Sequence, residues 1–164
     1  MIATDRLALA RLFALLTPAL LLGGALGSQY IGGLFPCEMC MWQRWPHLVA
    51  IFFALDAYAL KRRPEMAELF TALAGLAIAV SGAIGVFHAG VEYGWWEGLT
   101  ACTVNAAGGS AQDMFNSIMN APLIRCDVPQ WTLFGISLAG FNTIFSLGAA
   151  AVIITLLFPR KAQS

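Results

Sequence analysis

The stretch Leu69–Ala89, LFTALAGLAIAVSGAIGVFHA, contains 21 residues and no Asp, Glu, Lys or Arg. About 20 apolar residues in a helix span the hydrocarbon core of a bilayer, so this stretch is predicted to cross a membrane. The composition of the whole chain agrees with that prediction. Of its 164 residues, 59% are hydrophobic and 11% are charged, whereas a typical soluble domain carries about 25% charged residues.

Three further apolar stretches are predicted to span the membrane, at residues 12–30, 41–60 and 133–158. The second has the weakest signal, because Arg44 lies near its start and Asp56 near its end. The first is longer than the apolar region of a secretory signal peptide, so we expect it to be retained as a helix. The predicted fold is all-α, a bundle of four transmembrane helices.

The chain is expected to form a single membrane domain over residues 1–164, because no linker, internal repeat or low-complexity tract divides it. Its positive charges predict the orientation. Seven of the nine Lys and Arg residues lie before the first span, between the second and third, or after the fourth. The positive-inside rule makes these segments and both termini cytoplasmic. Residues 31–40 and 90–132 then form two loops on the outer side.

All four cysteines, Cys37, Cys40, Cys102 and Cys126, lie in the two predicted outer loops. That side of a bacterial membrane is oxidising, so disulfides are expected there. Four cysteines allow three pairings, and sequence alone does not choose among them. Cys102 and Cys126 suit either redox chemistry or a structural disulfide, which would stabilise the fold by roughly 3 kcal/mol.

The spacing of Cys37 and Cys40 indicates chemistry more than stabilisation, because a bridge across two intervening residues restrains little of the chain. Close C-x-x-C pairs serve redox reactions or bind zinc. A zinc site of this type needs a second pair of ligands at short spacing. Neither Cys102 nor Cys126 has a partner cysteine or histidine at such spacing, so we predict redox chemistry and no metal.

The segment that begins at Pro36, PCEMCMWQRWPH, combines the dithiol with a cation at the start of the second span. With Pro36 in the first helical turn, Cys37 lies at a helix N-terminus, whose partial positive charge favours a thiolate. Cys40, Arg44 and His47 then follow on the same helix face. Arg44 is predicted either to stabilise a thiolate or a polar oxygen of a ligand, or only to reach the lipid headgroups.

These features together resemble the DsbB family of bacterial disulfide-bond formation proteins. The resemblance covers essentially the whole chain: four spans, the motif CEMCMWQR, a second outer loop with two more cysteines, and PQWTLFGIS before the last span. It implies a thiol oxidase of the bacterial inner membrane, with its cysteine loops in the periplasm. Such an enzyme reoxidises the periplasmic oxidant DsbA and passes the electrons to a membrane quinone, ubiquinone or menaquinone, and on to the respiratory chain.

The resemblance also implies an order of electron transfer among the four cysteines. Reduced DsbA attacks a Cys102–Cys126 disulfide and forms a mixed disulfide at Cys102. Cys126 then exchanges with Cys37, and Cys40 passes the electrons to the quinone. All four are therefore candidate catalytic residues.

Arg44 and His88 are the candidate quinone-binding residues. The resemblance implies that Arg44 contacts the quinone headgroup and that His88, at the outer end of the third span, lies near it. Gln43 is assigned no catalytic role, because some family members carry an acid at its position. No role for His47 is carried over from the family.

The second outer loop also carries a short amphipathic pattern. Apolar residues recur there at helical spacing, at Met114, Phe115, Ile118 and Met119. We expect a short helix that rests on the outer membrane surface and keeps Cys126 near Cys37.

Two other functions remain open at this stage. A paralogous oxidase would serve one dedicated DsbA-like partner, and a non-catalytic membrane scaffold would hold two structural disulfides. Nucleic-acid binding is not expected, because the formal net charge is zero and no basic surface is predicted. The sequence does not indicate which quinone is used or how the cysteines pair at rest.

Overall fold

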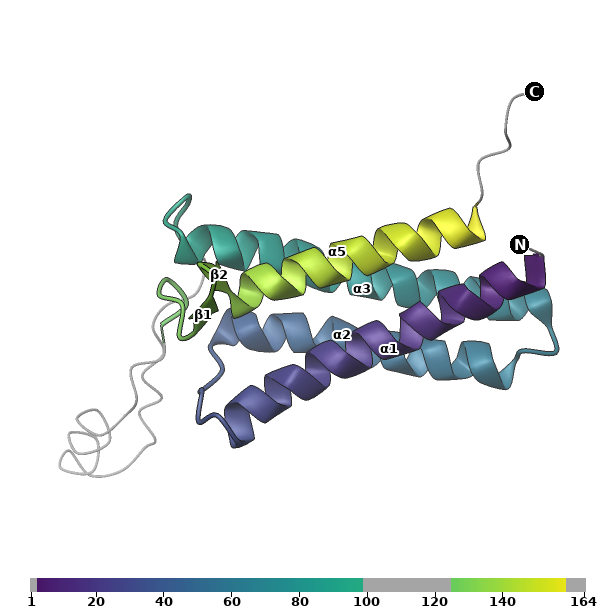
Figure 1. The fold of residues 1–164 in the computed structure, drawn as a ribbon, viewed down its shortest axis with the longest axis horizontal. Helices are drawn as coiled ribbons and strands as arrows, with labels where there is room; N and C mark the ends of the chain where they lie inside the picture. Colours follow the sequence, from purple (N-terminus) through teal and green to yellow (C-terminus); the bar gives the residue numbers. More distant parts are fainter. Residues whose placement is uncertain (1–2, 99–124, 159–164) are drawn as a thin grey trace, which may run out of the picture.

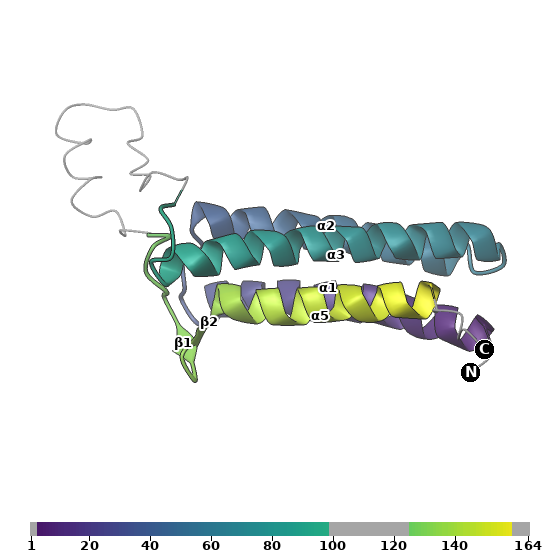
Figure 2. The same cartoon turned by 90° about the horizontal axis from the view of Figure 1, so that it is seen from above.

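The computed structural model describes residues 3–98 and 125–158. Within them the chain forms four long helices and a hairpin: α1 (Ala3–Tyr30), α2 (Glu38–Ala59), α3 (Pro64–Glu92), β1 (Thr132–Leu133), β2 (Ile136–Ser137) and α5 (Leu138–Leu157). The helices run alternately up and down the bundle (Figure 1). Figure 2 shows α2 and α3 in one layer and α1 and α5 in the other. The predicted surface helix at residues 114–119 lies outside the described residues.

Three of these helices, α1 from Asp5 onward, α3 and α5, are long and apolar enough to cross a membrane. α2 is long enough with 22 residues, but its composition is more polar. Its polar side chains Gln43 and His47 are buried among the other helices, and burial inside a bundle lets a membrane helix carry polar groups. The chain is therefore an all-α membrane protein with three candidate spans and a fourth helix packed against them.

A hairpin precedes α5 where the fourth span was predicted to start. β1 and β2 pair antiparallel, and the turn residues Phe134 and Gly135 have φ angles of 52° and 77°. Positive φ at both central residues matches the twist of a two-residue hairpin. Within the predicted span of about residues 133–158, the helix begins at Leu138, after the hairpin.

Tyr93 joins this hairpin to the end of α3. Its hydroxyl donates to the Gly135 carbonyl oxygen at 2.9 Å and accepts the N–H of Ser137 at 3.0 Å. The Ser137 hydroxyl accepts the N–H of Gly140 at 3.1 Å and so caps α5. The C-terminal end of α3 and the N-terminal end of α5 are thereby held together.

Small residues let the helices approach closely. A Cβ atom at Gly82 would lie 2.8 Å from Leu147 Cδ2, and one at Gly85 would lie 2.7 Å from Thr143 Oγ1. The largest cluster of buried apolar residues consists mainly of alanines: Ala14, Ala50, Ala54, Ala74, Ile78 and Ile153. Close approach of this kind is how membrane helices pack without a hydrophobic driving force. It also brings polar side chains of α2, α3 and α5 within reach of one another.

Candidate functional site

The dithiol lies at the start of α2. Cys37 is the N-cap residue, with extended backbone angles of φ −75° and ψ 173°, and its sulfur accepts the N–H of Cys40 at 3.2 Å. The prediction that Cys37 lies at a helix N-terminus is confirmed. The predicted position of Pro36 was wrong, because Pro36 precedes the cap and is not in the first helical turn.

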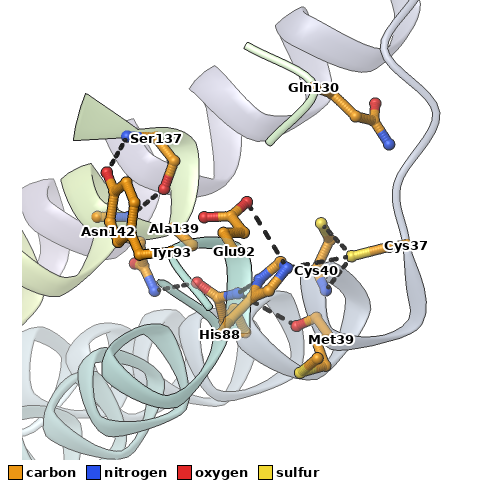
Figure 3. A network of polar contacts seen from close by, with 12 residues as sticks. Cys37, Met39, Cys40, His88, Glu92, Tyr93, Gln130, Ser137, Ala139 and Asn142 are labelled. Atoms are coloured by element: carbon orange, nitrogen blue, oxygen red, sulfur yellow. Dashed lines mark hydrogen bonds and ion pairs between the residues drawn. The ribbon is translucent and has the colours of Figure 1, made fainter. Parts of the chain in front are cut away.

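The two sulfur atoms of the dithiol are 2.7 Å apart (Figure 3). Cys37 is buried, with 3% of its surface exposed, and Cys40 is half-buried. A disulfide has a sulfur–sulfur distance of about 2.05 Å. A small movement is therefore enough to join the two sulfurs when the pair loses two electrons and two protons.

The contact between the sulfurs separates the acidities of the two thiols. The hydrogen bond from Cys37 lowers the pKa of the Cys40 thiol, and the charge of Arg44 acts in the same direction. The hydrogen bond to Cys40, together with burial, raises the pKa of the Cys37 thiol. Cys40 is therefore the more acidic thiol of the pair, and a thiolate is the reactive form of cysteine.

His88 reaches the dithiol from α3. Its Nε2 lies 3.5 Å from Cys37 Sγ and 3.8 Å from Glu92 Oε1 (Figure 3). The His88 side chain is buried, with 2% of the residue exposed. His88 was predicted from the family resemblance to lie near a quinone, and the structure places it directly against Cys37.

Two amide side chains that were not selected from the sequence complete this cluster. Gln43 Nε2 lies 2.7 Å from His88 Nδ1, and Gln43 Oε1 accepts an N–H of Asn142 at 2.7 Å. Both amides are buried. A signal for Asn142 was present, because a polar residue in an apolar span normally faces the bundle interior. Gln43 carried a weaker signal, since it lies beside Arg44 near the mouth of a span.

Arg44 faces α1. Its guanidinium donates hydrogen bonds to Gln29 Oε1 and to the carbonyl oxygen of Ala25, the latter at 3.1 Å. These bonds hold the cation against a neighbouring helix. Arg44 therefore does more than reach the lipid headgroups, which was one of the two predicted roles.

His47 lies deeper in the bundle. Its Nε2 is 2.8 Å from Asn142 Oδ1 and 2.9 Å from Ser81 Oγ. His47 also lines the same cavity as the dithiol and Arg44. The predicted common face of α2 is confirmed to that extent, although Arg44 bonds to α1 and His47 to α3 and α5.

The cavity has a volume of about 240 Å³ and lies between the four helices and the segment before the hairpin. Its polar and sulfur-containing lining residues include Cys37, Cys40, Gln43, Arg44, His88 and Asn142. Its apolar lining residues include Leu20, Leu21, Leu34, Phe35, Leu138 and Phe141. A largely apolar cavity with a few convergent polar groups is typical of a small-molecule site. This one suits a ligand with a polar head and an apolar body.

Cys126 also lies beside the dithiol. It packs against the buried cluster of Cys37, Met39 and Val91. The structure thus brings together three of the four predicted redox cysteines. The fourth, Cys102, lies outside the described residues.

Cys37 Sγ, Cys40 Sγ and a ring nitrogen of His88 lie within 4.8 Å of one another. Two thiolates and an imidazole are also zinc ligands, and a tetrahedral zinc with bonds of 2.3 Å holds its sulfurs about 3.8 Å apart. The sulfurs are 2.7 Å apart here. The spacing therefore suits a dithiol that becomes a disulfide better than a preformed zinc site.

Comparison with known proteins agrees with this chemistry. The family model "Disulfide bond formation protein DsbB" matches residues 7–156. The chain is 29% identical over 143 residues to "Disulfide bond formation protein B" of Chromohalobacter salexigens, which covers 76% of this chain and 80% of that protein. It is 29% identical over 146 residues to the protein of the same name from Hahella chejuensis, with 80% and 82% covered.

An uncharacterized protein of Rickettsia prowazekii is 23% identical over 165 aligned residues, which cover 99% of this chain and 94% of that protein. No solved structure matches the chain. The family model covers all four helices almost completely, and with them the dithiol and the cavity. The chain belongs to the DsbB family of disulfide bond formation proteins.

Proposed function

We propose that the protein is a membrane thiol oxidase that reoxidises a periplasmic DsbA-type protein and passes the electrons to a membrane quinone. The observation that carries the proposal is the close dithiol of Cys37 and Cys40 on the wall of a cavity that is lined by both polar and apolar side chains. A disulfide donor in the periplasm and an acceptor in the lipid meet most easily at such a place. The names of the similar proteins support a role in disulfide bond formation.

The proposed topology has four spans in the bacterial inner membrane, with both termini cytoplasmic. α2 is proposed as the fourth span because it lies beside α3 in one layer and runs between the same two ends of the bundle (Figures 1 and 2). The dithiol and the hairpin lie at the same end, which we assign to the periplasm. The whole chain, residues 1–164, is proposed to be one membrane domain.

Electrons are proposed to enter through Cys102 and Cys126. A thiolate of reduced DsbA attacks Cys102 in the Cys102–Cys126 disulfide, and Cys126 leaves as a thiolate. The second DsbA thiol, after losing its proton, then displaces Cys102 from the mixed disulfide. DsbA is now oxidised, and Cys102 and Cys126 have taken up its two electrons.

The electrons are then proposed to move to the dithiol. The Cys126 thiolate attacks Cys37 in a Cys37–Cys40 disulfide, and Cys40 leaves as a thiolate. The Cys102 thiolate displaces Cys37 and restores the first disulfide. The packing of Cys126 against Cys37 supports this route. So does the lowered pKa of Cys40, because a thiol of lower pKa leaves faster.

Oxidation of the dithiol completes the cycle. Cys37 and Cys40 lose two electrons and their protons as their disulfide forms, and a quinone takes up two electrons and two protons to become a quinol. Arg44 is proposed to hold a ring oxygen of the quinone, because a guanidinium donates several hydrogen bonds from a fixed fork. His88 is proposed to lie between that ligand and Cys37, since both it and Arg44 line the cavity.

The test uses the purified protein in detergent, reduced DsbA and a short-chain ubiquinone or menaquinone, with quinone absorbance as the readout. We expect one quinone to be reduced for each DsbA oxidised, and no reduction with Cys40→Ser. Phe52→Leu is the matched control on α2, because Phe52 is exposed on the outside of the bundle. Loss of stability in Cys40→Ser, without any quinone reduction by the unaltered protein, would indicate a structural scaffold.

The identity of the partner has its own test. A DsbA variant without its second active-site cysteine should remain attached to the protein as a mixed disulfide, and peptide mapping should find it on Cys102. Attachment to Cys126 would contradict the proposed order of the relay. Failure to react with DsbA, together with oxidation of another periplasmic dithiol protein, would indicate a dedicated partner.

A further inference from the structure

A buried chain of hydrogen bonds leads from the bundle core to the dithiol. It joins Asn142 of α5 to Gln43 of α2, Gln43 to His88 of α3, and His88 to Cys37. None of these four residues is more than 9% exposed. In the interior of a membrane bundle an unpaired polar atom is costly. The partners therefore reveal which atoms are donors.

The carbonyl oxygen of Met39 determines the orientation of the Gln43 amide. Gln43 Nε2 lies 3.2 Å from that oxygen, and a backbone carbonyl can only accept a hydrogen bond. The atom that faces Met39 must therefore be the amide nitrogen. Gln43 Oε1 then faces Asn142, at 2.7 Å from Asn142 Nδ2.

The Asn142 amide is oriented in the same way. Its Nδ2 lies 3.1 Å from the carbonyl oxygen of Ser81, so this atom is also a donor. Asn142 Oδ1 accepts hydrogen bonds from His47 at 2.8 Å and from Ser146 at 2.9 Å. Both ends of the Asn142 amide are satisfied, and Asn142 therefore holds Gln43 in one orientation.

The orientation of Gln43 decides which nitrogen of His88 carries the proton. Gln43 Nε2 is a donor, so His88 Nδ1 at 2.7 Å must accept. A neutral imidazole that accepts at one nitrogen is protonated at the other. The Nε2–H of His88 then faces Cys37 Sγ at 3.5 Å and Glu92 Oε1 at 3.8 Å (Figure 3), and the His88 ring also has a hydrogen bond with the backbone of Cys126.

We infer that Gln43, oriented by Asn142, is a positioning residue that keeps the proton of His88 on Nε2, so that this N–H is presented to the sulfur of Cys37. The inference rests on the proposed redox function of the dithiol. It assigns to Gln43 a role that the sequence did not predict.

The Nε2–H of His88 affects the reactivity of the Cys37 thiol. To close the disulfide, the sulfurs of Cys37 and Cys40 join while the quinone takes up two electrons and two protons from the pair, and negative charge develops on the Cys37 sulfur as its proton leaves. That sulfur already accepts the N–H of Cys40 at 3.2 Å, and the Nε2–H of His88 is a second donor. Donors to a thiolate stabilise its charge. With the proton on Nδ1, His88 would present a lone pair to the developing charge instead.

The same proton position bears on metal binding. A zinc held by Cys37 and Cys40 would need a lone pair from the nitrogen that faces them. That nitrogen is Nε2, and the inferred tautomer protonates it. Gln43 therefore favours hydrogen bonding by His88 over ligation at this end of the ring.

The inference is tested by determining the tautomer of His88 in the reduced, quinone-free protein by NMR. The chain has only two histidines, so ¹⁵N-histidine labelling gives a spectrum of two rings that His47→Asn assigns. We expect the proton of His88 on Nε2. In Gln43→Met, which keeps the length of the side chain but removes its donor, we expect a mixture of tautomers and about a 10-fold slower oxidation of the dithiol, the loss expected for one hydrogen bond to a charged group.

Two further variants separate an effect on the His88 tautomer from a general loss of folding. Gln43→Glu replaces the donor by an acceptor, so neutral His88 should carry its proton on Nδ1 at high pH. Thr143→Val is the matched control, because the Thr143 hydroxyl donates to Ala139 O of its own helix, and the tautomer should not change.

A proton on Nδ1 in the unaltered protein would overturn the inference, and so would an unchanged tautomer in both Gln43 variants. The samples for these spectra contain neither DsbA nor quinone. If the protein shows the expected His88 tautomer but reduces no quinone, the proposed function is overturned and the positioning of His88 by Gln43 still holds.

Discussion

Replacing Asn142 by Leu should destabilise the bundle by about 2.4 kcal/mol, since four hydrogen bonds at about 0.6 kcal/mol each are typical of membrane interiors. The bond to Ser81, whose carbonyl oxygen and hydroxyl share one N–H at 3.1 and 3.2 Å, counts as one, and the others are those with Gln43 at 2.7 Å, His47 at 2.8 Å and Ser146 at 2.9 Å. Leu has the same number and branching of side-chain heavy atoms as Asn, so the replacement leaves no cavity. The loss should therefore reflect the missing hydrogen bonds.

The free energy of unfolding is measured by titrating the protein from a mild detergent into SDS and following tryptophan fluorescence. Thr143→Val is the neighbouring control. It removes one hydrogen bond within α5, from the Thr143 hydroxyl to Ala139 O, so it should destabilise the bundle by about 0.6 kcal/mol. A loss below 1 kcal/mol for Asn142→Leu, or equal losses in the two variants, would refute the reasoning.

Three further changes test the packing and the site. Gly82→Ala should destabilise the bundle by about 1–3 kcal/mol in the same SDS titration, because the new Cβ would lie 2.8 Å from Leu147 Cδ2. Arg44→Met should raise the KM for quinone about 10-fold, as expected for a lost bond from a charged donor, and leave the KM for DsbA unchanged. Removing the thiol of Cys37 by Cys37→Ala should raise the pKa of Cys40, because the bond that lowers it is lost; thiolate absorbance at 240 nm then appears at higher pH.

For each of these three predictions, one result would contradict the expectation. Unchanged stability in Gly82→Ala would mean that α3 and α5 are less closely packed than the structure indicates. An equal rise of both KM values in Arg44→Met would assign Arg44 to the structure of the bundle and not to quinone binding. If the Cys40 thiolate appears at the same pH with and without the Cys37 thiol, the sulfur–sulfur hydrogen bond is not the cause of the lowered pKa of Cys40.

The helices were largely predictable, because lipid demands long apolar runs that are visible in the sequence. The interior face of α2 was less predictable. The prediction placed Cys37, Cys40, Arg44 and His47 on one face of that helix, because of their spacing. The face that the structure buries consists of Met39, Gln43, His47, Ala50, Ala54 and Ala57. The three alanines at helical spacing were a signal for that face, since small residues mark helix contacts in membranes.

The start of α5 was not predictable from residue types. The hairpin turn needs positive φ at Phe134 as well as at Gly135, and a bulky residue seldom adopts that conformation. The hairpin also depends on the hydroxyl of Tyr93, which comes from the other end of the long second loop. A contact between residues so distant in the sequence leaves no local pattern.

The membrane is what makes the buried amides informative. In water either end of an amide finds a partner, so its orientation says little about its neighbours. In the core of a membrane bundle an unpaired polar group costs several kcal/mol. The backbone carbonyls of Met39 and Ser81 therefore determine how Gln43 and Asn142 are oriented, and through them the proton of His88.

This arrangement couples the chemistry of the dithiol to the packing of helices. α3 and α5 meet at Gly82, and Asn142 of α5 bonds both to the neighbouring Ser81 of α3 and to Gln43 of α2. A change that separates the two helices should release Gln43 and allow the proton of His88 to move from Nε2 to Nδ1. Gly82→Ala should therefore slow oxidation of Cys37 as well as destabilise the bundle, although Gly82 contacts neither sulfur. If it lowers stability but leaves the rate and the His88 tautomer unchanged, the coupling is absent.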